Sequence, residues 1–251
     1  MPSAYSVTAL SGVPMVRPGD DLAAVVTDAL AASGMTLEED DIVVLAQKIV
    51  SKAEGRQVSL SKVEPSAAAL ELARETGKDP RLVHLILDEA EAVVRVRPGL
   101  LIVRNRHGLV LANAGIDQSN VGVGDVLLLP ADPDASAARL RTALLAATGR
   151  TVAVLVIDSL GRAWRMGTAG TTIGLAGMPG VLDLRGRRDL TGRPLESSDL
   201  AFADEVAAAA SLAMGQADEG TPVVIVRGLT YPRSTDQARS IVRPAAMDLF
   251  R

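Results

Sequence analysis

Two aspartates stand where apolar runs of the chain give way to polar residues. Asp117 lies in the stretch NAGIDQSN, two residues before Ser119, and Asp158 ends the apolar run VAVLVI, with the Ser159 hydroxyl adjacent. Carboxylate, hydroxyl and amide oxygens are the ligands that hard divalent cations prefer. Such a cation commonly bridges the phosphate oxygens of a substrate. The alternative is that both aspartates only make turn hydrogen bonds at strand ends, which is common.

Three further segments have residue types that suit phosphate binding. Lys48 and Lys52 lie in QKIVSKAEGR, where their ammonium groups could neutralise a triphosphate or belong to a solvated face. The segment GTAGTTIG (167–174) is either an anion-binding nest of backbone amides or a flexible surface loop. The segment MGQADEGT (214–221) has two glycines that would allow close approach to a ligand, or it is an ordinary helix-to-strand connection.

Composition excludes several other kinds of chemistry. The chain of 251 residues has no cysteine and only two histidines, which excludes disulfides, thiolate metal sites and a multi-histidine zinc site. Neither GxxxxGK[ST] nor a complete GxGxxG is present, so a P-loop is excluded. Aromatic residues make up 2% and the net charge is −4, which argues against nucleic acid as a partner. We find no signal peptide and no apolar stretch of spanning length, so we expect a cytoplasmic protein without membrane contact.

The elements that must position these residues alternate along the chain. Apolar runs predict strands at 42–46, 100–103, 109–112, 126–129, 152–157 and 223–226, the last two buried on both faces. Capping residues and periodicity predict helices at 21–32, 67–76, 80–94, 135–148 and 200–214, the last capped by Asp199, and a short one after Thr235. The segment 174–198 is expected to be irregular. The fold class is therefore α/β (mixed α+β), with interleaved helices and strands.

Taken together, these segments resemble the coenzyme F420-0:L-glutamate ligase family, the γ-glutamyl ligases that elongate the tail of a deazaflavin coenzyme. The matching stretches follow the family order across nearly the whole chain. They are VPMVRPGDDL, QKIVSKAEGR, NAGIDQSN, LLPADPDASAARLR, VIDSLGRAWRMG, GRRDLTGRPL, ADEVAAAASLAMG and VIVRG.

The resemblance implies GTP as a substrate, together with L-glutamate and F420-0, and two divalent sites for Mg²⁺ or Mn²⁺; it allows K⁺ as well. Carried onto this chain, the catalytic residues are Asp117, Asp158 and Lys52. The metal ligands are Asp117, Asp158, Ser159 and Gln216. The GTP contacts are Val13, Pro14, Met15, Val16, Gln47, Lys48, Lys52, Asn120, Met214, Gly215, Gln216, Ala217, Asp218, Glu219, Gly220 and Thr221. The chain departs from the family pattern in two respects. Gln216 stands where some relatives have Glu, and the segment 214–221 has fewer glycines than the same segment in some relatives.

The implied mechanism is acyl activation. The γ-phosphoryl group of GTP would pass to a carboxylate, and the glutamate amine would then displace phosphate to form an amide. We expect one catalytic unit over residues 1–251, with room for two intertwined subdomains and without the nitroreductase-like domain of some relatives. The resemblance also implies a homodimer. A metal-dependent phosphohydrolase and a non-catalytic nucleotide-binding protein remain as alternatives.

Overall fold

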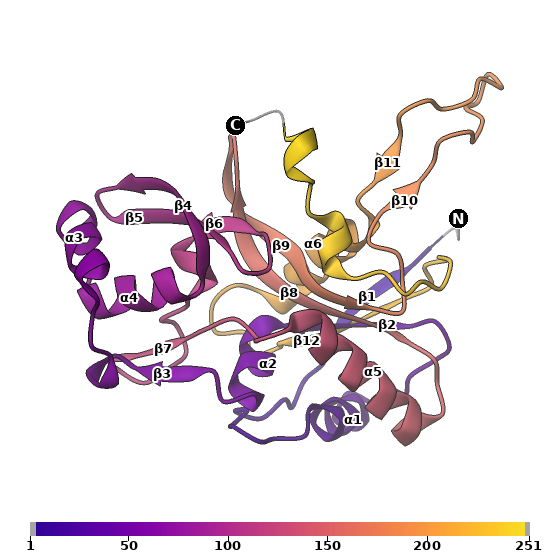
Figure 1. Ribbon diagram of the computed structural model, residues 1–251. Coiled ribbons are helices and arrows are strands. Elements are labelled where there is room, and N and C mark those ends of the chain that lie inside the picture. Colours follow the sequence, from indigo (N-terminus) through magenta and orange to yellow (C-terminus); the bar gives the residue numbers. More distant parts are fainter. Residues whose placement is uncertain (1–3, 249–251) are drawn as a thin grey trace.

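A mixed five-stranded sheet forms the centre of the protein. The computed structural model describes residues 4–248. In order across the sheet, the strands are β1 (Ser6–Ala9), β12 (Val223–Arg227), β2 (Ile42–Ala46), β8 (Ala153–Arg162) and β9 (Arg165–Ala176). Only β2 and β8 are parallel neighbours within this sheet, and the other pairs are antiparallel. Strands β1, β2 and β8 therefore all end at the same edge of the sheet (Figure 1).

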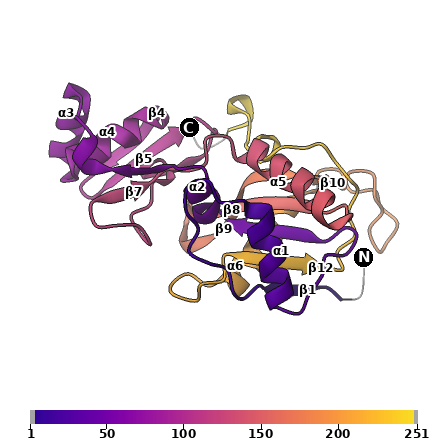
Figure 2. The ribbon, with the colours of Figure 1, turned by 90° about the horizontal axis from the view of Figure 1, so that it is seen from below.

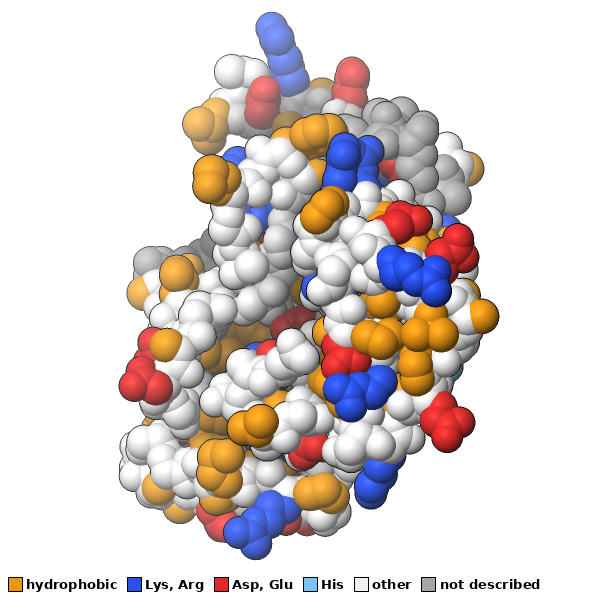
Figure 3. All heavy atoms as spheres, turned by 90° about the vertical axis from the view of Figure 1, so that its left-hand side faces the viewer, with side chains coloured by type: hydrophobic (Ala, Val, Ile, Leu, Met, Phe, Trp, Pro, Cys, Tyr) orange, Lys and Arg blue, Asp and Glu red, His pale blue; other side chains and the backbone are white. Residues whose placement is uncertain are grey.

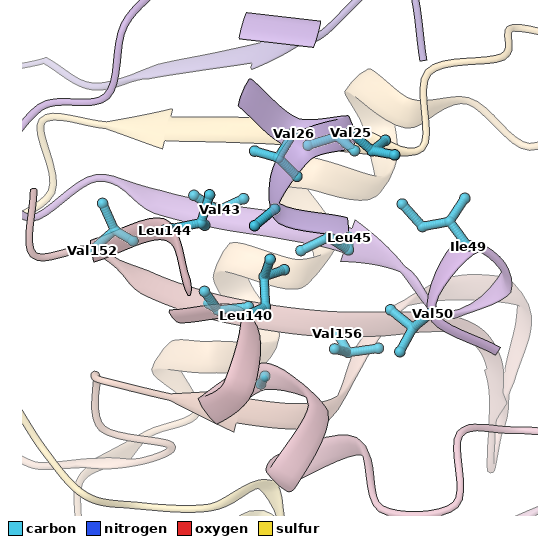
Figure 4. Packing of buried hydrophobic residues seen from close by; sticks show 14 of the residues in the cluster. Val25, Val26, Val43, Leu45, Ile49, Val50, Leu140, Leu144, Val152 and Val156 are labelled. Carbon is cyan, nitrogen blue, oxygen red and sulfur yellow. The ribbon is translucent and has the colours of Figure 1, made fainter. Parts of the chain in front are cut away.

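The central strands are buried on both faces, as their continuous apolar sequences predict. In β2, Val43 and Leu45 pack into one core, and Ile42 and Val44 into the other. Helices α1 (Leu22–Ala32) and α5 (Pro133–Thr148) cover the first face, as Figures 2 and 4 show. Helix α6 (Phe202–Met214) covers the second face. This layering confirms the mixed α/β class.

A second lobe lies beside the sheet and has its own hydrophobic core. The chain enters it after α2 (Gln47–Ala53) and leaves it before α5 (Figure 1). Its elements are β3 (Gln57–Ser59), η1 (Leu60–Lys62), α3 (Ala67–Thr76), α4 (Pro80–Asp88), β4 (Ala90–Arg97), β5 (Leu100–Asn105), β6 (Val110–Ala112), η2 (Asn113–Gly115) and β7 (Asp125–Leu127). Strands β5 and β6, which confirm the strands predicted at 100–103 and 109–112, pair antiparallel as a hairpin. Acidic and basic side chains are interspersed on the face shown in Figure 3, without a large patch of one sign.

The expected helix over 80–94 is wrong in its second half. Helix α4 ends at Asp88, and β4 pairs with β5 through Val93 opposite Val103 and Val96 opposite Leu101. The alternation in AEAVVRVR and its β-branched valines favour a strand once a partner strand is available. Pairing with β5 therefore determines the conformation of 90–97 more strongly than the helical periodicity of its sequence does.

The segment 167–174 is neither a nest nor a loop, because all of it lies within β9. Two of its glycines allow helices to pack closely. A Cβ at Gly170 would overlap with the Ala207 carbonyl and Ser211 of α6, and one at Gly174 would overlap with Pro133 of α5. The glycines therefore serve packing on both faces of the sheet.

Two hairpins project from the body. One is the tip of β8 and β9, where 161–168 is exposed, and the other is the arm 184–198, closed at its base by β10 (Leu182–Asp183) and β11 (Asp199–Leu200). The expected irregular stretch is thus largely this arm. Asp199 belongs to β11 instead of capping α6, whose N-cap is Ala201.

Two short helical turns lie at the C-terminal side of the described chain. The chain passes through η3 (Ala238–Ile241) and η4 (Ala245–Met247), of which η3 is the short helix expected after Thr235. In the part of the chain that the structure describes, no helix combines the length and the apolar character needed to cross a bilayer.

Gly170→Ala should lower the free energy of unfolding by about 1–3 kcal/mol, because the added methyl group meets the backbone of α6. Gly161→Ala is the matched control, since a Cβ there meets nothing within 4 Å. Urea denaturation of both variants measures the difference. Equal stability of the two variants would contradict the packing role of Gly170.

Candidate active site

Four predicted segments meet at one edge of the sheet. Ala46 at the end of β2 lies opposite Ile157 of β8, and its N–H donates to the Pro222 carbonyl at 2.9 Å. The N–H of Leu10, just after β1, donates to the Val223 carbonyl at 2.9 Å. The segments that follow β1 and β2, the segment that precedes β12 and the part of β8 beyond Ile157 therefore share this edge. They contain 13–16, Gln47 with Lys48, 214–221, and Asp158 with Ser159. The prediction that Asp158 stands at a strand end is wrong, because β8 continues through it to Arg162 in a hairpin with β9.

An ion pair joins this edge to the second lobe. Lys48 Nζ lies 2.6 Å from Asp117 Oδ2, and both side chains are partly exposed. Asp117 also accepts hydrogen bonds from the N–H and the hydroxyl of Ser119, at 2.7 and 3.0 Å. Burial alone would raise the Asp117 pKa, but the hydrogen bonds from Lys48 and Ser119 outweigh it and hold the pKa below its ordinary value. Asp117 is therefore an anion across the neutral pH range.

An unusual backbone stretch delivers Asp117 to this position. Asn113, Ala114 and Gly115 all have positive φ, of 53°, 57° and 78°. The chain then forms a bridge in which Asp117 and Leu127 exchange N–H···O bonds of 2.9 and 2.8 Å. Consecutive left-handed residues are costly for a non-glycine such as Ala114, and such strain is concentrated at functional sites. The sequence NAG thus turns the chain from β6 toward α2.

Asp158 lies near this ion pair and has the opposite pKa shift. Burial raises its pKa, and the negative charge of Asp117 adds to this, while the Ser159 N–H at 2.9 Å and the Lys48 charge oppose it. Ser159 directs its hydroxyl to Gln216 Oε1 at 2.7 Å, and Gln216 Nε2 donates to Ser211 Oγ at 3.1 Å. A hydroxyl and an amide oxygen are therefore adjacent at Ser159 within β8, and Ser159 follows the Asp158 carboxylate directly in sequence.

Lys52 follows Lys48 by one helical turn on α2. Burial lowers its pKa, the Lys48 charge lowers it further, and Asp117 opposes the shift. Two lysines on one short helix repel each other when both are charged, so each makes the charged form of the other less stable. A nearby polyanion would offset this repulsion. Such an arrangement suits a phosphate ligand.

Gln47 and Asn120 differ in their surroundings. Gln47 is buried, its Oε1 accepts from Ser51 Oγ at 2.9 Å, and its Nε2 has no hydrogen-bond partner among the described residues. A ligand could supply the acceptor that this buried amide N–H group lacks. Asn120 is exposed in the loop after Asp117, with φ of 56°.

The two backbone segments predicted to contact GTP are held differently. In 13–16, Val16 is buried in the first core and Met15 is 73% exposed, and this loop is fixed farther on by the Gly19 N–H bond to Ala53 at 2.8 Å. In 214–221, the Glu219 carboxylate accepts from the Ala217 N–H at 2.8 Å and occupies the space beside Gly215. Residues 216–220 are exposed.

The predicted metal ligands offer only oxygen atoms. No group of three or more His, Cys, Asp or Glu suited to a metal occurs within residues 4–248. Asp117 and Asp158 are two carboxylates with mutual repulsion, and Ser159 and Gln216 add neutral oxygens. This donor set fits Mg²⁺ or Mn²⁺, since both prefer oxygen and a cation would relieve the repulsion.

Most predicted site residues come together, and two contributors were missed. Ser211 holds Gln216, and Thr171 lies opposite Asp158 on β9. A serine on the buried face of an alanine-rich helix is the signal that could have identified Ser211. Four arginines, Arg185, Arg187, Arg188 and Arg193, lie on the projecting arm, and Arg185 pairs there with Asp183 at 2.6 Å.

Comparison with known proteins gives a consistent result. Residues 12–228 match the family model described as F420-0:Gamma-glutamyl ligase. The chain is 48% identical over 250 residues to the Coenzyme F420:L-glutamate ligase of Methanothermobacter thermautotrophicus, covering 98% of each chain. It is 49% identical over 240 residues to the protein of that name from Methanopyrus kandleri, covering 94% of this chain and 93% of the other. The Methanocaldococcus jannaschii protein of that name is 43% identical over 215 residues, with 86% of each covered.

Asp117→Asn should lower the pKa of Asp158 and lower that of Lys52 further. The Asp117 charge raises both values, so its removal shifts both downward. An NMR titration of the Asp158 carboxyl carbon and the pH dependence of Lys52 acylation measure the two shifts. Asp183→Asn, on the projecting arm, is the control. If neither pKa moves, Asp117 does not share an electrostatic site with these residues.

Proposed function

Because the chain belongs to the F420-0:gamma-glutamyl ligase family, we propose that it joins L-glutamate to the deazaflavin precursor F420-0 through an amide bond, with GTP as the energy source. The observation that carries this proposal is the meeting of the Lys48–Asp117 pair with Asp158, Ser159 and Gln216 at one sheet edge. Further γ-linked glutamates could be added by the same chemistry.

The proposed reaction begins at a carboxylate of the precursor, which is a poor electrophile. One of its oxygens attacks the γ-phosphorus of GTP, the bond to the β-phosphate oxygen breaks, and GDP leaves. The neutral glutamate amine then attacks the acyl carbon, loses a proton and displaces phosphate. The products are the amide, GDP and phosphate. Positioning and charge neutralisation supply most of the catalysis in such phosphoryl transfers.

Each residue has a role that follows from its surroundings. Lys48 and Lys52 would face the triphosphate, and its charge would restore the lowered pKa of Lys52. Asp117, Asp158, Ser159 and Gln216 would hold two Mg²⁺ or Mn²⁺ ions, with K⁺ as a further cation. These ions, when bound, neutralise charge on the transferring phosphoryl group.

The nucleotide would contact this edge of the sheet through the neighbouring segments. Gln47 Nε2 has no partner in the described structure and is a donor for a nucleotide oxygen. Asn120 and the backbones of 13–16 and 214–221 would complete the contacts. Glu219 must then leave its position beside Gly215 if the backbone of that loop is to approach a phosphate.

We also propose that the protein acts as a homodimer. The two projecting hairpins carry large apolar side chains that the described chain leaves uncovered. These are Met166 and Leu190, which are 98% and 108% exposed. Such side chains are commonly covered by a second copy in obligate dimers.

The proposal is tested by incubating the protein with GTP, Mn²⁺, L-glutamate and F420-0, followed by mass measurement of the product. We expect a mass increase of one glutamyl residue and glutamate-dependent GDP release, with GTP preferred over ATP. Glutamate-independent hydrolysis of GTP would indicate a phosphohydrolase instead. Binding of GTP without turnover would indicate a non-catalytic nucleotide-binding protein.

Asp158→Asn should reduce turnover by at least about 100-fold, because the loss of one charge within β8 weakens both cation binding and phosphate alignment. Steady-state GDP release at low Mn²⁺ measures the effect, and circular dichroism checks the fold. Asp183→Asn should behave as the unmodified protein. Near-normal turnover of Asp158→Asn would remove Asp158 from the catalytic site.

Gln216→Glu should lower the Kd for Mn²⁺ by about tenfold, because it adds a third carboxylate beside Ser159. Isothermal titration calorimetry with Mn²⁺ measures the affinity, and Gln237→Glu in an exposed turn is the control. Unchanged or weaker Mn²⁺ binding would show that position 216 does not face the cation.

A further inference from the structure

A cavity lies outside the site described above, between the second lobe and the free edge of β9. It consists of two adjoining hollows of about 150 and 320 Å³, which share Leu109, Thr172, Ala238 and Val242 as lining. The turn between β5 and β6, the beginning of α5 and the η3 segment enclose it. Pockets for drug-sized ligands typically measure about 300–1,000 Å³, so this cavity suits a small polar molecule.

Two buried polar atoms in the cavity wall lack partners. Thr172 is 3% exposed, and its Oγ1 makes no hydrogen bond within the described part of the chain. The same holds for His107 Nε2. Buried polar atoms are nearly always hydrogen-bonded, so two orphans on one cavity indicate a missing ligand.

The wall of the smaller hollow has a hydrogen-bond acceptor and charges of both signs. His107 hydrogen-bonds the Pro130 carbonyl, and burial lowers its pKa, so the neutral ring presents Nε2 as an acceptor. Asp132 and Asp134 at the beginning of α5 add negative charge. Arg106, which pairs with Glu89, and Arg239, which makes no ion pair within residues 4–248, add positive charge. An acceptor and carboxylates together with a guanidinium group that has no ion-pair partner match a zwitterion.

The cavity also lies close to the proposed site of phosphoryl transfer. Thr171 lines the larger hollow and is the cross-strand partner of Asp158. Directly opposite residues of an antiparallel pair lie about 5 Å apart and share one face of the sheet. A small molecule in the cavity is therefore one strand away from Asp158.

We propose that this cavity is the subsite for the acceptor amino acid, L-glutamate. The ammonium group faces His107 Nε2 and Asp132, a carboxylate faces Arg239, and Thr172 Oγ1 supplies a further hydrogen bond. Bound there, glutamate passes one ammonium proton to His107 Nε2 and presents its neutral amine from the side of β9, while GTP occupies the edge beside α2. This assignment rests on the proposed ligase function and specifies where its second substrate binds.

Thr172→Val and Arg239→Gln test the assignment. Because neither side chain makes a hydrogen bond or an ion pair within the described fold, both variants should keep the thermal stability of the unmodified protein. We expect the KM for L-glutamate to rise at least about tenfold in each, with the KM for GTP unchanged. Calorimetric titration of L-glutamate into the GTP-free protein should show the same loss. Thr142→Val, on the outer face of α5, is the control.

Each result separates the subsite from the function. An unchanged KM and Kd for glutamate, or an equal change in the KM for GTP, would overturn the subsite while leaving the ligase activity standing. A wild-type protein that binds glutamate in this cavity without glutamate-dependent GDP release would overturn the proposed function alone. If Thr172→Val changes the KM for neither glutamate nor GTP but raises the thermal stability, the cavity holds only water and the subsite is overturned.

Discussion

The parallel pairing of β2 with β8 is the constraint on which the site depends. It places Ala46 opposite Ile157, so that the next residues of both strands emerge side by side at one edge of the sheet. Lys48 lies in α2 directly after β2, and Asp158 with Ser159 lies in the part of β8 that continues beyond Ile157. The antiparallel strand β12 between β1 and β2 brings the loop 214–221 to the same edge. A one-residue change in the register would turn Asp158 toward the opposite face and separate it from Lys48.

Electrostatics at this edge is unbalanced in a way that favours ligands. The carboxylates of Asp117 and Asp158 repel each other, and so do the ammonium groups of Lys48 and Lys52. Among these four groups, only Lys48 and Asp117 form an ion pair. A folded protein that had no ligand to bind would gain stability by replacing such groups with neutral ones. The site therefore resembles others in which function is retained at a cost in stability.

Much of this organisation could be predicted from the sequence, because strand ends and capping residues are local signals. The apolar runs located the central strands, and Asp117, Asp158 and the lysines were identified by their types and positions. The contact between Lys48 and Asp117 could not be predicted from those signals, since it depends on how the second lobe folds back over 113–117. The packing role of Gly170 could not be predicted for a similar reason, because whether a glycine gives backbone freedom or allows a helix to pack closely depends on a partner distant in sequence. The valines of β4 show the same limit, because their partner strand decided their conformation.

The insertion of the second lobe between β2 and β8 also bears on how the chain reaches its native state. Residues 47–152 separate the two parallel strands, and closing an unstructured segment of that length carries a large entropic cost. The lobe has its own core, formed largely by contacts between neighbours in sequence, such as α3 with α4 and β4 with β5. Local contacts form faster than distant ones. Once the lobe has folded, β3 and β7 lie side by side, and the loop that remains to be closed is much shorter. Early folding of the lobe that contains Asp117 would thereby also lower the entropic cost of pairing β2 with β8.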